Sequence, residues 1–426
     1  MMTASTSNAR CRVLLFSTQH AKRARWSGVF AMALCVFALI ASEFMPVSLL
    51  TPMASDLGIS EGLAGQGISI SAILAVLTSL SISSLARAVD RKALMLSLTG
   101  LMCFSGAVIA YASSYATYMI GRALIGIAIG GFWSMSAAIA MRLVPTAEVP
   151  RALAIYNGGN ALATVVAAPL GSYLGSLIGW RGAFLCLVPV ALIAGMWQWV
   201  SLPAMPANVR ARTGSVLRLF RSRRVAVGML AVSLFFMGQF TLFTYVRPFL
   251  ETVTKVGAST LSLILFVMGC AGFVGTAVIG RILKSALYRT LAVIPVLMSL
   301  SAIALIAVGH RVAAVAAILG IWSLVATAAP VGWWTWVART LSEDAEAGGG
   351  LMVAVIQLAI GCGSMVGGWL FDTWGYGIAF MTSAGLLLTA AFLVFLTARL
   401  ATSKVDSGHS TAGALVRIAP SPQGRH

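Results

Sequence analysis

The stretch SEFMPVSLLTP, residues 42–52, places a carboxylate inside an apolar run that begins near Trp26. Along a helix, Glu43 lies roughly 25 Å from Trp26 and about 13 Å from Pro52. Of the eleven Asp and Glu residues, Glu43 alone falls well inside such a run, and the others lie in loops or at run ends. Burial without a partner favours the neutral, protonated form of a carboxyl group. Glu43 is therefore a candidate for proton uptake and release; the alternative is a permanently hydrogen-bonded structural anchor.

Two prolines, Pro46 and Pro52, follow this glutamate within nine positions. A proline inside a helix leaves the carbonyl four residues earlier without its usual partner and bends the axis. Pro46 therefore frees the carbonyl of Ser42, beside Glu43. Both prolines are candidates for a conformational role that opens the helix toward a cavity; an ordinary tolerated kink is the alternative.

Arg122 is a second charged residue inside an apolar run, in GRALIGIAIGGFW. It lies roughly 9 Å from the end of its run, at a depth similar to that of Glu43. An arginine at this depth needs an anion or a cavity. We expect Arg122 to be a partner of Glu43 or of a ligand; extension of the side chain to the lipid head groups is the alternative. Gly126 and Gly130 follow at four-residue spacing and leave one face open for close helix contact.

Polar side chains in other apolar runs are candidates for ligand binding. Asn157, Asn160 and Thr164 share one helix face, which we expect to line a cavity; hydrogen bonding between helices is the alternative. Amides and hydroxyls beside aromatic rings suit a neutral, planar, hydroxylated ligand. For Trp333, which belongs to a group of three tryptophans, a membrane-interface belt is the alternative. The other candidates are Gln239, Tyr245, Trp333 and Gln357.

The elements that hold these residues are predicted to be membrane-spanning helices. The chain has 426 residues, 59% hydrophobic and 9% charged, whereas soluble domains are about one quarter charged. This leaves too little polar surface for a globule in water, so we predict an all-α integral membrane protein. A helical crossing needs about 20 apolar residues, and twelve runs approach or exceed this length. They fall at roughly 27–52, 62–86, 93–113, 116–142, 151–178, 181–200, 225–250, 259–280, 289–308, 312–338, 348–372 and 376–398.

The net charge of +18 at pH 7 comes from basic residues whose distribution indicates the membrane topology. With the N-terminus placed in the cytoplasm, 24 of the 29 Lys and Arg residues fall on the cytoplasmic side. This bias is the positive-inside rule, and it predicts that both termini are cytoplasmic. We expect attraction to anionic membrane lipid and no nucleic-acid partner.

The chain divides into two halves of six crossings that resemble each other. GSYLGSLIGWRGAF (171–184) aligns without gaps on GGWLFDTWGYGIAF (367–380), and EFMP (43–46) has a weaker counterpart in YVRP (245–248). Two such halves enclosing a midplane cavity are the plan of a transporter whose halves rock. The predicted divisions are a cytoplasmic tail 1–25, a first half 26–200, a basic cytoplasmic linker 201–224, a second half 225–398 and a cytoplasmic tail 399–426.

Pro169 and Gly171, with Gly159 and Gly175, suit a bend and tight packing between the two halves. Chemistry of other kinds is not indicated. The sequence has no phosphate-binding GKS/T loop and no catalytic triad, and its six cysteines lack metal-ligand or CxxC spacing. We expect no enzyme, no catalytic residue, no metal and no cofactor. An ion or substrate gradient, such as a proton gradient, must then supply the energy.

Three stretches resemble motifs of the major facilitator superfamily, in its twelve-helix drug:proton antiporter branch, over about residues 26–400. GRALIGIAIGG matches the arginine motif of this branch on Arg122. VVAAPLGSYLG resembles the antiporter motif, with Ala168 where glycine usually precedes Pro169. The resemblance implies the major facilitator fold.

The third stretch, SLARAVDRKALML, is a degraded form of the cytoplasmic loop motif of the superfamily. Arg87 stands at the usual aspartate and Asp90 at the usual glycine, while Arg91 and Lys92 remain. The resemblance makes Asp90 and Arg91 candidates for a conformational role.

Five further stretches resemble the bacterial purine ribonucleoside efflux pumps. They are EFMPVSLLTPMASDLGISEG, GGFWSMSAAIAMRLVP, GQFTLFTYVRP, PVGWWTWVARTL and VAVIQLA. The resemblance implies export of nucleosides such as inosine and guanosine across the inner membrane by proton antiport, and we expect a monomer. Glu43 would alternate between protonated and substrate-bound states, with Arg122 tuning it. Sugar or multidrug efflux on the same scaffold is one alternative, and a receptor that transports nothing is another.

Overall fold

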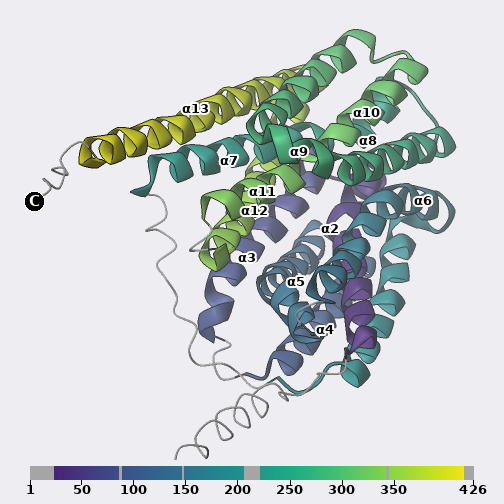
Figure 1. Cartoon of the computed structure of the whole chain (residues 1–426). Coiled ribbons are helices and arrows are strands. Elements are labelled where there is room, and N and C mark those ends of the chain that lie inside the picture. The colour runs from purple at the N-terminus through teal and green to yellow at the C-terminus, as the bar shows by residue number, and fades with distance from the viewer. Residues whose placement is uncertain (1–23, 86–88, 146–147, 206–220, 342–344, 417–426) are drawn as a thin grey trace, which may run out of the picture.

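The computed structural model describes residues 24–85, 89–145, 148–205, 221–341 and 345–416, and within them it contains helices and no strand. The all-α prediction is confirmed. The first half of the chain forms α2 (Trp26–Leu57), α3 (Glu61–Leu85), α4 (Arg91–Ala110), α5 (Tyr115–Arg142) and α6 (Val149–Ser201) (Figure 1). The second half forms α7 (Arg223–Phe243), α8 (Val246–Thr252), α9 (Ala258–Val308), α10 (Val312–Ala326), α11 (Ala329–Thr340), α12 (Ala345–Trp374) and α13 (Tyr376–Val416).

Eleven segments of the described residues are long and apolar enough to cross a membrane. The longest, Arg151–Ser201, has 51 residues, which is about 77 Å of helix and more than twice the thickness of a hydrocarbon core. It is interrupted at Gly179, where φ is 75° and ψ is 164°. Counting its two parts separately gives the twelve crossings that the sequence predicts.

Equivalent glycines mark the internal repeat. Gly179 and Gly375 pair in the alignment of 171–184 with 367–380, and both adopt a left-handed backbone, with φ of 75° and 80°. Residues with a Cβ rarely occupy this region, so glycine is required at both turns. Each turn joins the fifth and sixth crossings of its half, which gives the sequence repeat a structural cause.

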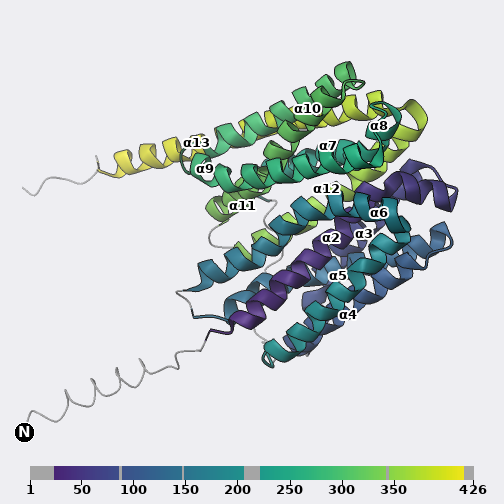
Figure 2. The same cartoon turned by 90° about the vertical axis from the view of Figure 1, so that its right-hand side faces the viewer.

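The two halves form separate bundles that meet along one boundary (Figure 2). Across this boundary α3 packs against α12, and α6 packs against α9. Small residues allow these approaches: Gly361 of α12 lies against Ala72 of α3, and Gly269 of α9 lies against the backbone of Val165 of α6.

The bundle has two ends, which we name by the chain segments that they carry. The terminal face is the end at which α2 begins and α13 ends (Figure 2). The opposite face carries the connections after α2, α4, α8 and the second crossing of α9.

Helix α2 packs most extensively on α6 through glycines. Gly159 lies against the backbone of Ala33, Gly171 against Ser48 and Gly175 against Leu49. The sequence analysis placed these glycines between the two halves, and that expectation is wrong. They contact α2, which belongs to their own half, because α2 and α6 lie side by side there.

One predicted segment boundary differs from the helices, and two predicted segments lie mostly outside the described residues. The basic linker 201–224 lies mostly outside the described residues, in 206–220, and the tail 1–25 does so in 1–23. The last crossing was predicted to end at residue 398, but α13 continues to Val416. No proline interrupts the chain from residue 376 to residue 416, so nothing in the backbone stops the helix at the predicted position.

The packing inside the first half can be tested by a substitution at Gly126. A Cβ at this position would lie 2.7 Å from the Cα of Ser71 in α3, so the backbones of α3 and α5 must separate in Gly126→Ala. We expect a loss of about 1–3 kcal/mol in stability, measured as a lower thermal unfolding midpoint in detergent. Gly100→Ala is the matched control, because a Cβ there meets no heavy atom within 4 Å. Equal midpoints for the two variants would contradict the packing described.

Candidate functional site

Glu43 lies in the middle of α2 with only 6% of its surface exposed. Gln357 of α12 donates its side-chain N–H to Oε1 of Glu43 at 3.3 Å. Gln357 is also buried, and it comes from the other half of the molecule. The carboxyl group therefore lies at the boundary between the halves.

Arg122 lies close to Glu43 but binds the backbone around it. The side chain is fully buried. Its Nε donates to the carbonyl of Gly67 at 2.9 Å, its Nη1 to the carbonyl of Ser42 at 2.9 Å, and its Nη2 to the hydroxyl of Ser71 at 2.8 Å. Nη2 also donates to the peptide carbonyl of Glu43 at 3.4 Å.

These contacts bear on two expectations about Arg122. The guanidinium does not extend to the head groups, because it has no exposed surface. It lies beside Glu43, but in the described structure it donates to the peptide carbonyl of Glu43 and not to its carboxylate, so a partner role for Arg122 stays a prediction. The carboxylate consequently stays available for a proton or a ligand.

Pro46 explains why an arginine is needed at this place. It removes the N–H that would otherwise bond the carbonyl of Ser42 within α2. An unpartnered carbonyl away from water is costly, and Nη1 of Arg122 occupies this one. The proline and the arginine thus act together on one carbonyl of α2, next to Glu43.

Aromatic rings and an amide surround the same part of the boundary. Phe44, next to Glu43, stacks on Phe240 of α7 with ring centroids 5.9 Å apart. Gln239 precedes Phe240, and its Oε1 is buried without a hydrogen-bond partner in the described structure. An unpartnered amide oxygen can accept a hydrogen bond from a ligand donor.

The predicted polar face of α6 is exposed. Asn157 and Thr164 are exposed, and Asn160 is partly buried. The amide of Asn157 donates to the carbonyl of Leu153 at 2.9 Å, and the hydroxyl of Thr164 donates to the carbonyl of Asn160 at 2.9 Å. These side chains therefore bond within their own helix, which does not support the alternative of interhelical hydrogen bonds.

The polar face of α6 is distinct from the apolar face that membrane lipid would cover. Leu162, Leu170 and Leu177 are exposed and project from roughly the opposite side of the helix. Val165, next to Thr164 in the sequence, contacts Gly269 of the other half. The polar face accordingly lies beside the boundary between the halves.

Two predicted ligand residues lie in packed interiors. Trp333 is buried, with its ring centroid 6.1 Å from that of Trp336 and 6.3 Å from that of Phe235. Tyr245 is also buried; its hydroxyl donates to the carbonyl of Ser364 at 2.8 Å, and its ring stacks on Phe371. Neither side chain presents a surface to a ligand in this arrangement of the halves.

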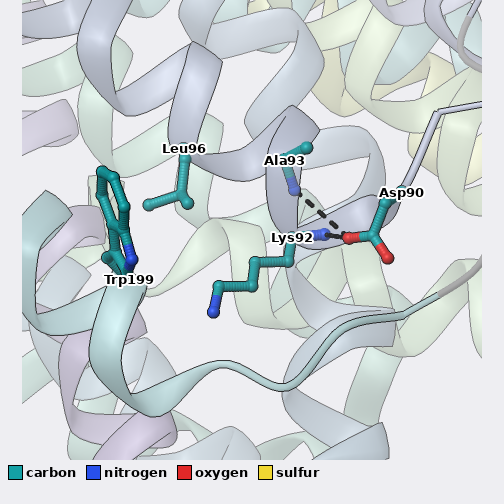
Figure 3. Close-up of a pocket in the computed structure, with 5 residues that line it drawn as sticks. All are labelled: Asp90, Lys92, Ala93, Leu96 and Trp199. Carbon is teal, nitrogen blue, oxygen red and sulfur yellow. Dashed lines mark hydrogen bonds between the residues drawn. The ribbon is translucent and has the colours of Figure 1, made fainter.

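The loop before α4 is fixed to the end of the first half. Oδ1 of Asp90 accepts hydrogen bonds from the backbone N–H of Lys92 and Ala93, and Oδ2 accepts one from Met205. The N–H of Arg91 donates to the carbonyl of Met205. Arg87 lies outside the described residues. A cavity of about 200 Å³ beside the start of α4 is lined by Asp90, Lys92, Ala93, Leu96 and Trp199 (Figure 3).

Arg247 is a buried charged residue that sequence analysis did not single out. It comes from α8 of the second half and donates to the carbonyl of Ser48 in α2. Pro52 lies four positions after Ser48, so the sequence already indicates that the Ser48 carbonyl lacks its helical partner. The sequence does not indicate that Arg247 is the donor that replaces it.

A family model described as the Major Facilitator Superfamily matches residues 32–349. The chain belongs to this superfamily. It is a multi-pass membrane transporter and not an enzyme, as the sequence analysis predicted. The fold of two six-helix halves is the fold of this family.

Curated relatives cover nearly the whole chain. A Pseudomonas aeruginosa protein named "Transcription regulatory protein OpdE" is 62% identical over 90% of this chain and 96% of its own length. An Escherichia coli O1:K1 / APEC protein named "Purine ribonucleoside efflux pump NepI" is 42% identical over 87% of this chain and 94% of its own length. The predicted resemblance to purine ribonucleoside efflux pumps is confirmed.

Solved structures show the same fold. The nucleoside transporter NupG, solved as a point mutant, has a TM-score of 0.71 and 14% identity, over 87% of this chain and 98% of its own. A bacterial homologue of the human lysosomal transporter Spinster has a TM-score of 0.72 and 15% identity, over 89% of this chain and 98% of its own.

The geometry of Arg122 generates a stability test. In Arg122→Lys a single ammonium replaces a guanidinium whose three nitrogens donate separately to Gly67, Ser42 and Ser71. At least one of these buried acceptors then loses its partner. We expect a loss of about 2–4 kcal/mol, seen as a lower unfolding midpoint in detergent. Arg142→Lys, an exposed arginine on the same helix, should unfold at the wild-type midpoint. The same midpoint for Arg122→Lys would show that the guanidinium is not needed.

Proposed function

We propose that this transporter exports purine ribonucleosides such as inosine and guanosine in exchange for protons. The identity of 42% with a named purine ribonucleoside efflux pump, over 94% of that pump, carries the substrate class. The charge bias of the sequence supports a cytoplasmic terminal face and an outward opposite face. In a bacterium this orientation supports the inner membrane as its location. No cofactor is required, and the proton gradient supplies the energy.

The contact between Glu43 and Gln357 supports the proton coupling. A carboxylate only accepts hydrogen bonds, whereas a protonated carboxyl group also donates one. The amide of Gln357 has both a donor and an acceptor, so it pairs with either form by turning over. Because Gln357 and Glu43 belong to different halves, the protonation of Glu43 changes a bond that the halves share. That is the requirement for coupling a proton to rocking.

Polar groups along the boundary between the halves suit a nucleoside. Gln239 has a buried amide oxygen without a partner, and Asn157, Asn160 and Thr164 offer amide and hydroxyl groups on an exposed face. A planar base can stack on rings such as Phe44, and ribose hydroxyls can bond the amides. When the Glu43 proton leaves, the carboxylate can accept hydrogen bonds from ribose hydroxyls or base N–H groups.

The energy of one proton is sufficient for export. A proton that crosses 100 mV and one pH unit gains about 3.7 kcal/mol. This sustains a gradient of several hundred-fold for a neutral substrate exchanged with one proton.

A regulatory output is the second candidate function. It rests on the name of the Pseudomonas aeruginosa relative, which is 62% identical over 90% of this chain. A membrane protein that senses a nucleoside and signals would bind the ligand without moving it. Binding of inosine by the purified protein without any flux in proteoliposomes would favour this function over export.

The proton coupling is tested in proteoliposomes that carry an imposed pH gradient. Glu43→Gln keeps an amide that can still hydrogen-bond Gln357 but cannot release a proton. We expect at least a tenfold loss of pH-driven uphill inosine transport, while exchange of labelled for unlabelled inosine continues. Glu61→Gln, the same change at the start of α3, should transport like the wild type. Full uphill transport by Glu43→Gln would remove Glu43 from the coupling.

The substrate is tested in the same vesicles by competition. Unlabelled purine nucleosides should displace labelled inosine, and pentoses and cationic drugs should not. Displacement by pentoses alone or by drugs alone would assign the chain to sugar or multidrug efflux.

A further inference from the structure

Helix α2 presents two backbone carbonyls that have lost their helical partners, and two arginines occupy them. Pro46 frees Ser42, which binds Arg122 of the same half. Pro52 frees Ser48, which binds Nη1 of Arg247 from the other half. The chemistry of the two pairs is the same, but only the second pair connects the halves.

Arg247 is held in position by its own half. Its Nε donates to Oε1 of Glu251 at 2.9 Å, and Nη2 lies 2.8 Å from the same oxygen. Both residues belong to α8, four positions apart. The charge of Arg247 therefore keeps a partner when the bond to Ser48 breaks, so that this bond can open and close without leaving a bare ion in an apolar site.

The bond between Arg247 and the Ser48 carbonyl is buried. Arg247 is 8% exposed and Ser48 has no exposed surface. An apolar cluster of Leu50, Ala54, Ala64 and Tyr245 joins the two halves at the same level. In such surroundings a charged donor on a carbonyl binds more strongly than it does in water.

A second polar contact between the halves lies at the same face. Asp372, near the end of α12, accepts hydrogen bonds from the backbone N–H of Gly62 at 3.0 Å and from the hydroxyl of Ser60. Two polar contacts thus cross the boundary at the opposite face: the bond of Arg247 to the acceptor that Pro52 supplies, and the pair of bonds to Asp372.

We propose that Arg247 and the Ser48 carbonyl form a latch that holds the opposite face closed, and that Pro52 serves to supply the acceptor. Rocking of the halves must break this bond each time the opposite face opens. The latch needs only that the halves rock, so it stands apart from the nucleoside and proton proposals.

The test measures the distance between the halves at the opposite face by electron–electron double resonance. Spin labels at Ser113 and Ser259, which are exposed on different halves, report the closed and open populations of the full chain in lipid nanodiscs, with the six native cysteines replaced. We expect Arg247→Gln to raise the ratio of open to closed molecules about tenfold. Pro52→Ala restores a competing N–H and should raise it by about threefold.

Two controls separate the latch from general loosening. Arg181→Gln removes another arginine of the opposite face, which binds Asp56 and the carbonyl of Ala112 within one half, and it should leave the ratio unchanged. Adding Pro52→Ala to Arg247→Gln should cause no further opening, because both changes remove the same bond. Should Arg247→Gln fail to fold, Pro52→Ala retains every charge and gives the answer alone.

The outcomes decide the proposal. A rise in the open population with Pro52→Ala, absent in the Arg247→Gln background and absent in Arg181→Gln, supports the latch. An unchanged ratio in Pro52→Ala and Arg247→Gln, or an equal rise in Arg181→Gln, overturns it. Because the readout is a distance and not a flux, this result is independent of the transported substrate.

Discussion

The bond from Arg122 to the Ser42 carbonyl is the interaction on which the candidate site depends. Within a membrane a backbone carbonyl finds no water, so a proline in a crossing helix leaves a group that the protein itself must satisfy. Arg122 does so with one nitrogen, and it binds α3 with others. One buried side chain thereby joins α2, α3 and α5 beside Glu43.

This arrangement constrains the rest of the first half. The guanidinium reaches its acceptors only because Gly126 and Gly130 let α5 approach the backbone of α3 closely. Since Arg122 donates to backbone carbonyls and to the Ser71 hydroxyl, the Glu43 carboxyl group is left to the other half, where Gln357 contacts it. The same carbonyl chemistry, repeated at Ser48, ties α2 to α8. Helix α2 is thus both the support of the site and the contact between the halves.

The hydropathy pattern and the internal sequence repeat predicted much of this architecture. Twelve apolar runs predict the crossings, and the gapless alignment pairs Gly179 with Gly375, because span length and internal repeats can be read from local residue types. The depth of Glu43 and Arg122 follows from counting residues, and so does the carbonyl that Pro46 frees. The acceptors of Arg122 and the donor to Ser48 could not be predicted, because they depend on which helices meet.

Aromatic residues were the least predictable from sequence. A tryptophan has the same residue type whether it faces a cavity, the head groups or a core, and Trp333 lies in the core of the second half. Tyr245 pairs with Glu43 in the repeat, yet it packs between the halves at the opposite face. The two halves share a backbone plan while the same position carries a titratable carboxyl group in one and a packing ring in the other.

The central claim is that Glu43 exchanges a proton for the substrate, and its most direct test is proton release on binding. Inosine is added in excess to the purified protein in weakly buffered detergent near neutral pH, and the released protons are followed with an indicator dye. The account predicts that the wild type releases protons as it binds and that Glu43→Gln binds without releasing any. Binding by the wild type with no proton release, or equal release by Glu43→Gln, would contradict it.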